Sequence, residues 1–100
     1  MTKVTQTTKE FNSVWDAISD TPAESENMKV RAALMNDICE YIKRQKYTQV
    51  QAAKVCQITQ PRASDLINGR ISKFSLDALV NIAAAANLHV NITVKEEEFA

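Results

Sequence analysis

Between positions 22 and 86, apolar residues follow a helical spacing. In the first part of this stretch they recur every three or four residues, at Val30, Leu34, Ile38, Tyr41 and Ile42, as on one face of an α-helix. A threonine or serine suited to capping a helix stands before each apolar stretch, at Thr21, Thr48, Thr59 and Ser75. The pattern predicts four helices over residues 22–46, 49–56, 60–68 and 76–86.

The two ends of the chain differ from this helical middle. Residues 1–10 are polar, and the apolar residues that follow predict a short amphipathic helix near residues 13–19: Phe11, Val14, Trp15 and Ile18. From Leu88 to Val94 apolar and polar residues alternate, the period of a β-strand. The sequence therefore divides into an N-terminal arm with a short helix (1–20), a folded domain (21–94) and an acidic tail (95–100).

The predicted strand has no second strand in the same chain with which to pair. Because an isolated strand is unstable, we expect two copies of the chain to form an antiparallel pair across a twofold axis, through Val90, Asn91, Ile92, Thr93 and Val94. The apolar residues Leu88, Val90, Ile92 and Val94 would face the helices. The alternative is that this strand joins the sheet of a partner protein.

Composition limits the class of protein. The 100 residues are 45% hydrophobic and 24% charged, with one glycine and two prolines, which fits one mainly helical domain better than a sandwich or barrel rich in turns. No apolar run approaches the roughly 20 residues that cross a bilayer, and the N-terminus lacks the apolar core of a secretory signal. We therefore expect a cytoplasmic protein with no membrane partner.

Few residues suit catalysis or metal binding. Cys39 and Cys56 stand 17 positions apart without a C-x-x-C motif, and His89 is the only histidine, which is too few ligands for a zinc site. Gly69 alone cannot form a phosphate-binding loop. We expect no metal, no cofactor and no enzymatic activity; a hydrolase that uses carboxylates alone stays open, but no motif indicates one.

The net charge of zero conceals an uneven distribution. Residues 1–40 carry four basic and seven acidic residues (net −3), residues 41–75 seven and one (net +6), and residues 76–100 one and four (net −3). Because a polyanion responds to the local field of one surface, the basic middle is a candidate for nucleic-acid binding. The alternative is an ordinary solvated surface.

Two short predicted helices in this basic middle are joined by only three residues, 57–59. This is the arrangement of a helix-turn-helix, whose second helix enters the major groove of DNA. In that second helix the core positions are Ala63, Leu66 and Ile67, and the polar side carries Gln60, Pro61, Arg62, Asp65 and Asn68. Glutamine and arginine can bind the edges of adenine and guanine.

Residues 47–69 resemble the XRE, or lambda-repressor-like, helix-turn-helix family. The similarity lies in Thr48-Gln49 at the start of one helix, Ala53 within it, Thr59-Gln60-Pro61 at the start of the next and Asn68-Gly69 at its end. The segments 73–79 and 90–94 are similar to the HigA-type antitoxin branch, whose dimers bind DNA and neutralise a co-encoded, ribosome-dependent mRNA interferase. The resemblance covers residues 22–94 and implies a mainly α, lambda-repressor-like fold of five helices with one C-terminal β-strand.

The resemblance also implies roles for single residues. Gln49 and Gln60 would brace each other and the DNA backbone; Gln60, Pro61, Arg62 and Asp65 would face bases; and Asn68, Arg70 and Lys73 would hold a phosphate. Gln57 departs from the family, whose turn usually has glycine there, and would strain the turn or change its backbone. Asp65 either brings a negative charge to the DNA or pairs with Arg62 at i,i+3 spacing.

Together these features predict a homodimeric, sequence-specific DNA-binding repressor. The resemblance implies that it would be the antitoxin of a toxin-antitoxin pair and would bind its own operator. The alternatives are a phage-type or housekeeping regulator without a toxin, and a protein that sequesters a toxin with little DNA binding. The candidate toxin-binding residues are Phe11, Val14, Trp15 and Ile18 in the acidic N-terminal part, unless Trp15 packs on the domain itself.

Overall fold

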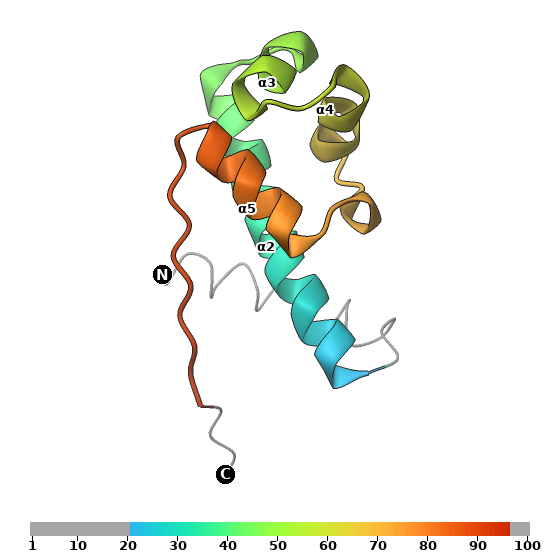
Figure 1. Ribbon diagram of the computed structural model, residues 1–100, viewed down its shortest axis with the longest axis vertical. Coiled ribbons are helices and arrows are strands. Elements are labelled where there is room, and N and C mark those ends of the chain that lie inside the picture. Colours follow the sequence, from blue (N-terminus) through green and yellow to red (C-terminus); the bar gives the residue numbers. More distant parts are fainter. Residues whose placement is uncertain (1–20, 97–100) are drawn as a thin grey trace.

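The computed structural model describes residues 21–96, and in them the chain is mainly helical (Figure 1). The elements are α2 (Pro22–Gln45), α3 (Gln49–Cys56), α4 (Gln60–Ile67), the short 3-10 helix η1 (Ile71–Lys73) and α5 (Leu76–Ala85). The mainly α prediction is confirmed, and each of the four helices predicted between residues 22 and 86 is present within one residue of its predicted end. The fifth predicted helix, near residues 13–19, lies outside the described residues.

Each of these α-helices begins at a hydroxyl side chain that accepts a backbone hydrogen bond. Thr21, Thr59 and Ser75 accept at 3.0, 3.3 and 3.1 Å from the backbone N–H three residues later. Thr48 does the same for Gln51, whose side chain accepts in return from the Thr48 N–H at 2.9 Å. Because each such cap contributes about 1 kcal/mol to stability, the helix starts are fixed locally by the sequence.

The core lies where α2, α4 and α5 meet. Its largest fully buried side chains are Ile38 on α2, Leu66 on α4, Leu79 on α5 and Phe74, just before α5. Helix α5 packs along α2, and α3 packs against α4 and α5 at one end of that pair (Figure 1). The short helices α3 and α4 therefore rest on the two longer ones, which fix their orientation. Among the described helices none is long and apolar enough to traverse a lipid bilayer.

The C-terminal segment corrects the sequence prediction. No strand occurs among residues 21–96, and residues 88–96 run as an extended chain that starts next to the end of α5 and continues down one side of the domain (Figure 1). Leu88 and Val90 pack on the core, whereas Ile92 and Val94 are 66% and 91% exposed. The prediction that all four apolar residues face the helices is therefore wrong for Ile92 and Val94. The physical reason is that a strand needs a neighbouring strand for its backbone hydrogen bonds, and the described part of this chain offers none.

Candidate nucleic-acid interface

Helices α3 and α4 form a helix-turn-helix joined at residues 57–59. Small buried side chains, Ala52 on α3 and Ala63 on α4, let the two helices approach closely. At the start of the two helices the Gln60 Nε2 donates a hydrogen bond to the Gln49 Oε1 at 3.3 Å. This contact between the first residues of both helices is the one that the resemblance implied.

The turn keeps the geometry that glycine usually supplies. Gln57 has φ 57° and ψ 44°, in the left-handed region, and its N–H bonds to the carbonyls of Ala53 and Lys54. Of the two predicted outcomes, the structure therefore has the strained residue and not a changed backbone. The strain arises because a residue with a Cβ atom is less stable in this region than glycine is. Gln57 therefore ends α3 in a conformation that glycine adopts at less cost.

The exposed side of α4 is opposite Ala63 and Leu66, which are fully buried. Helical geometry places on that side Pro61, Ser64, Asp65 and Asn68, with Gln60 at its N-terminal end. The Asn68 Nδ2 donates to the Ser64 Oγ at 3.3 Å. Ser64 was not among the predicted site residues, although its position four residues after Gln60 and four before Asn68 would have indicated the same helix face.

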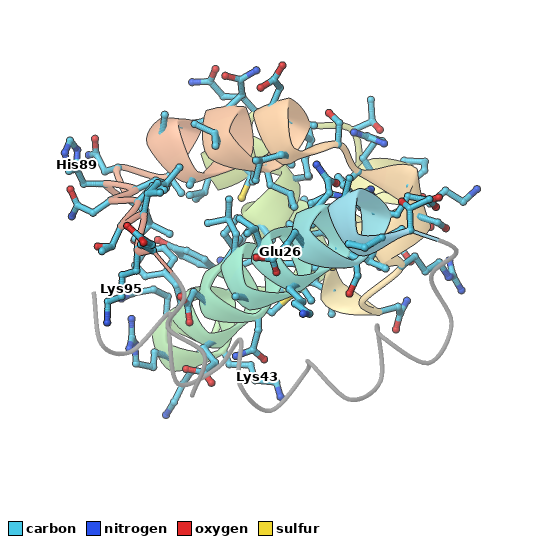
Figure 2. The ribbon with its side chains drawn as sticks, turned by 90° about the horizontal axis from the view of Figure 1, so that it is seen from below. Glu26, Lys43, His89 and Lys95 are labelled. Atoms are coloured by element: carbon cyan, nitrogen blue, oxygen red, sulfur yellow. The ribbon has the colours of Figure 1, made fainter. Side chains whose placement is uncertain are left out.

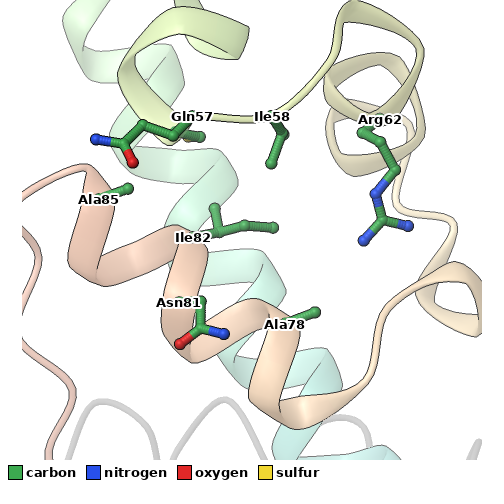
Figure 3. Close-up of a pocket in the computed structure, with 8 residues that line it drawn as sticks. Gln57, Ile58, Arg62, Ala78, Asn81, Ile82 and Ala85 are labelled. Carbon is green, nitrogen blue, oxygen red and sulfur yellow. The ribbon is translucent and has the colours of Figure 1, made fainter.

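The structure places Arg62 away from this exposed side. Its guanidinium donates a hydrogen bond to the Lys73 carbonyl at 2.8 Å and lies 4.3 Å from the centre of the Phe74 ring. Figure 3 shows the side chain extending from α4 toward α5, where it lines a pocket of about 280 Å³ with Ile58 and Asn81. Arg62 thus joins α4 to the start of α5 and does not point out from the helix-turn-helix as a base-contacting side chain would.

Asp65 and Arg70 form an ion pair, with the Arg70 Nη1 2.8 Å from the Asp65 Oδ1. The predicted i,i+3 pair of Asp65 with Arg62 is therefore wrong, because both of these side chains have other partners. Lys73, the other predicted phosphate-binding cation, is exposed in η1. Arg70, Lys73 and Asn68 all lie at or just beyond the C-terminal end of α4.

The two thiols are part of the interior rather than reactive groups. Burial raises the pKa of Cys39 from 9.0 to about 11 and also raises the pKa of Cys56. The Cys39 Sγ donates to the Leu66 carbonyl at 3.1 Å. Within residues 21–96 no group of three histidine, cysteine or acidic side chains is arranged to hold a metal ion.

The predicted dimerisation segment lies far from α4. Figure 2 shows the C-terminal segment, with His89 and Lys95, on the opposite side of the domain from η1 and the loop that follows α4, and Figure 1 agrees. Val90 is partly buried in this segment, whereas Asn91, Ile92, Thr93 and Val94 are exposed. The predicted partner-binding residues Phe11, Val14, Trp15 and Ile18 lie outside the described residues.

Comparison with known proteins agrees with this geometry. A family model described as a helix-turn-helix domain matches residues 17–95, which include every described helix. A search of the curated proteins gave no match. The chain therefore belongs to the helix-turn-helix domain family, in its XRE-type class.

Proposed function

We propose that this protein is a cytoplasmic transcriptional repressor that binds a specific operator in double-stranded DNA through α4. The observation that carries the proposal is the exposed polar side of α4, with Gln60 held at its start by the hydrogen bond to Gln49. Side chains of this kind on an exposed helix form hydrogen bonds with base edges in the major groove. The net charge of +6 over residues 41–75 supplies the attraction to phosphate.

We assign the predicted residues different roles in DNA binding. In the proposal Gln60, Pro61, Ser64 and Asn68 lie against the bases and nearby backbone, while Gln49, Arg70 and Lys73 contact phosphates. Arg62 acts inside the domain, because its guanidinium is engaged by the Lys73 carbonyl and the Phe74 ring. Asp65 acts through Arg70, with which it forms an ion pair.

The test measures binding to duplexes from the region upstream of the gene by fluorescence anisotropy, against a duplex of scrambled sequence. Gln60→Ala should cost about 1–3 kcal/mol on the specific duplex and little on the scrambled one. Gln45→Ala is the control, because Gln45 is an exposed glutamine at the C-terminal end of α2, outside the two helices of the helix-turn-helix. Equal affinity of the unaltered protein for both duplexes at physiological salt would refute the proposal.

We also propose that the protein binds DNA as a homodimer. One recognition helix contacts only a few base pairs, which is too little for selectivity against a genome, and closed twofold dimers are the common solution. Residues 90–94 supply a partner surface, since Ile92 and Val94 are exposed large apolar side chains in an extended segment that leaves α4 uncovered (Figure 1). The alternative is that this segment pairs with the sheet of another protein. Sedimentation of the purified chain distinguishes the two alternatives, because a homodimer forms without any other protein.

The finer proposal is that the repressor is the antitoxin of a toxin-antitoxin pair. It is supported by the similarity of residues 73–79 and 90–94 to HigA-type antitoxins. Co-purification with the product of the neighbouring gene tests it, and a truncation lacking residues 1–20 tests whether Phe11, Val14, Trp15 and Ile18 capture that toxin. The truncated protein should bind the operator normally and the toxin weakly. A truncation that neutralises the toxin fully would refute this role, and absence of any toxin would leave a phage-type or housekeeping regulator.

A further inference from the structure

Asp65 and Arg70 are tied together twice at the C-terminal end of α4. The Arg70 backbone N–H donates to the Asp65 carbonyl at 3.0 Å, and its guanidinium donates to the Asp65 carboxylate at 2.8 Å. Between them Gly69 has φ 71°, and its N–H donates to the Leu66 carbonyl at 3.1 Å. This left-handed glycine turn folds the chain back, so that a residue beyond the helix lies against one inside it.

The two partners differ in exposure. The Asp65 side chain is 20% exposed, whereas the Arg70 side chain is 55% exposed. An arginine has five N–H donors, and the structure shows the Arg70 Nη1 engaged by Asp65, so the guanidinium keeps donors for a further acceptor. Asp65 is the only acidic residue between positions 41 and 75, and its charge is covered on one side by this arginine.

We infer that Asp65 is a positioning residue: it contacts no base, and it holds the Arg70 guanidinium where it binds a backbone phosphate beside α4. This inference rests on the proposed DNA binding. A long arginine side chain normally loses rotamer entropy when it is fixed. The carboxylate of Asp65 restrains that side chain before DNA arrives, so less entropy is lost on binding.

A simple electrostatic role for Asp65 predicts the opposite result. If its carboxylate acted mainly as a negative charge near the duplex, it would repel phosphates, and its removal would tighten binding. If it positions Arg70, its removal weakens binding even though the net charge becomes more favourable. The sign of one measurement therefore separates the two roles.

The experiment measures duplex affinity over a range of salt for the unaltered protein and for Asp65→Ala, Asp65→Asn, Arg70→Ala and the double variant Asp65→Ala/Arg70→Ala. Glu26→Ala is the control, because it removes the same charge from an exposed side chain near the start of α2 (Figure 2). Thermal melting establishes that each variant folds. Both members of the pair lie outside the buried core.

We expect Arg70→Ala to weaken binding roughly tenfold on every duplex and to reduce the slope of log affinity against log salt by about 0.9, the value for one lost phosphate contact. Asp65→Ala should weaken binding about three- to tenfold, and the double variant should bind no more weakly than Arg70→Ala. Asp65→Asn should recover part of the loss, because an amide oxygen still accepts from the guanidinium. Glu26→Ala should bind as the unaltered protein does.

Two results would overturn the inference: tighter binding by both Asp65 variants, or an additive loss in the double variant, which would mean that Asp65 acts independently of Arg70. The proposed function fails in a different way, when the unaltered protein does not prefer the upstream duplex. Because a phosphate contact is independent of sequence, the pair can then still be tested on any duplex at low salt. If the protein binds no duplex at all, the inference falls with the proposed function.

Discussion

Gln57→Gly should stabilise the protein, although it removes a side chain and adds no contact. Gln57 ends α3 in the left-handed conformation, with φ 57° and ψ 44°, and its side chain is exposed. Its backbone N–H already bonds to the end of α3, and glycine preserves that bond. The substitution therefore changes mainly the backbone energy of one residue.

The magnitude follows from two opposing effects. A residue with a Cβ loses about 1–2 kcal/mol in the left-handed region relative to glycine. Glycine also has more freedom in the unfolded chain, which offsets about 0.4–1 kcal/mol. The expected net gain is about 0.5–1 kcal/mol, and for a domain of this size each kcal/mol raises the melting temperature by about 4–8 °C.

Thermal and urea unfolding followed by circular dichroism measure this gain. Gln57→Ala is the first control, since alanine keeps a Cβ and should not stabilise. Lys54→Gly is the second, because it places glycine at an exposed position inside α3 and should cost about 1 kcal/mol. If Gln57→Gly destabilised the protein as much as Lys54→Gly does, the explanation by backbone strain would be refuted.

Arg62→Ala should lower the free energy of unfolding by about 1–2 kcal/mol, because it removes a charged hydrogen bond and the contact with Phe74. Its preference among DNA bases should be unchanged. Urea unfolding and binding-site selection test this, and an altered base preference at unchanged stability would contradict it. Ile92→Pro should abolish dimerisation, because proline cannot donate a ladder hydrogen bond, and sedimentation showing an intact dimer would exclude pairing through residues 90–94. The folded-state pKa of Cys39 is raised from 9.0 to about 11, so its stabilising contribution is complete below pH 9 and is lost as the pH rises toward 11. The free energy of unfolding, measured with urea, should therefore fall less between pH 8 and pH 10.5 for Cys39→Ala than for the unaltered protein. An equal fall in both proteins would mean that Cys39 does not cause it.

The helices could be predicted from the sequence because their limits are set by neighbouring residues. Thr48 and Gln51, for example, form their reciprocal hydrogen bonds within one turn of α3. The C-terminal segment could not be predicted in the same way. Alternation from Leu88 to Val94 shows only that the chain can be extended, whereas a strand requires a second chain segment, which the described residues do not supply.

The candidate site could be predicted where the resemblance to the XRE family covers it and not where it depends on tertiary contacts. That resemblance implied the contact between Gln49 and Gln60, which the structure contains. The partner of Asp65 depends instead on the left-handed turn at Gly69, which brings Arg70 nearer than spacing along a regular helix suggests. A helical spacing that stops at the end of α4 offers Arg62, and not Arg70, as a partner for Asp65.

Arg62 is one of two arginines that hold the segment before α5. The Arg31 guanidinium of α2 donates to the Phe74 carbonyl at 3.0 Å, and the Arg62 guanidinium of α4 donates to the Lys73 carbonyl at 2.8 Å. These two consecutive carbonyls precede α5, so helix hydrogen bonds do not satisfy them. A helix of eight residues such as α4 is not stable by itself, and it takes its orientation from the elements that it contacts. Because Phe74 is buried and the Arg62 guanidinium lies over its ring, the junction helps to fix the angle of α4 against α2 and α5. It thereby also sets which side of α4 is turned outward, the side that the proposed function places against DNA.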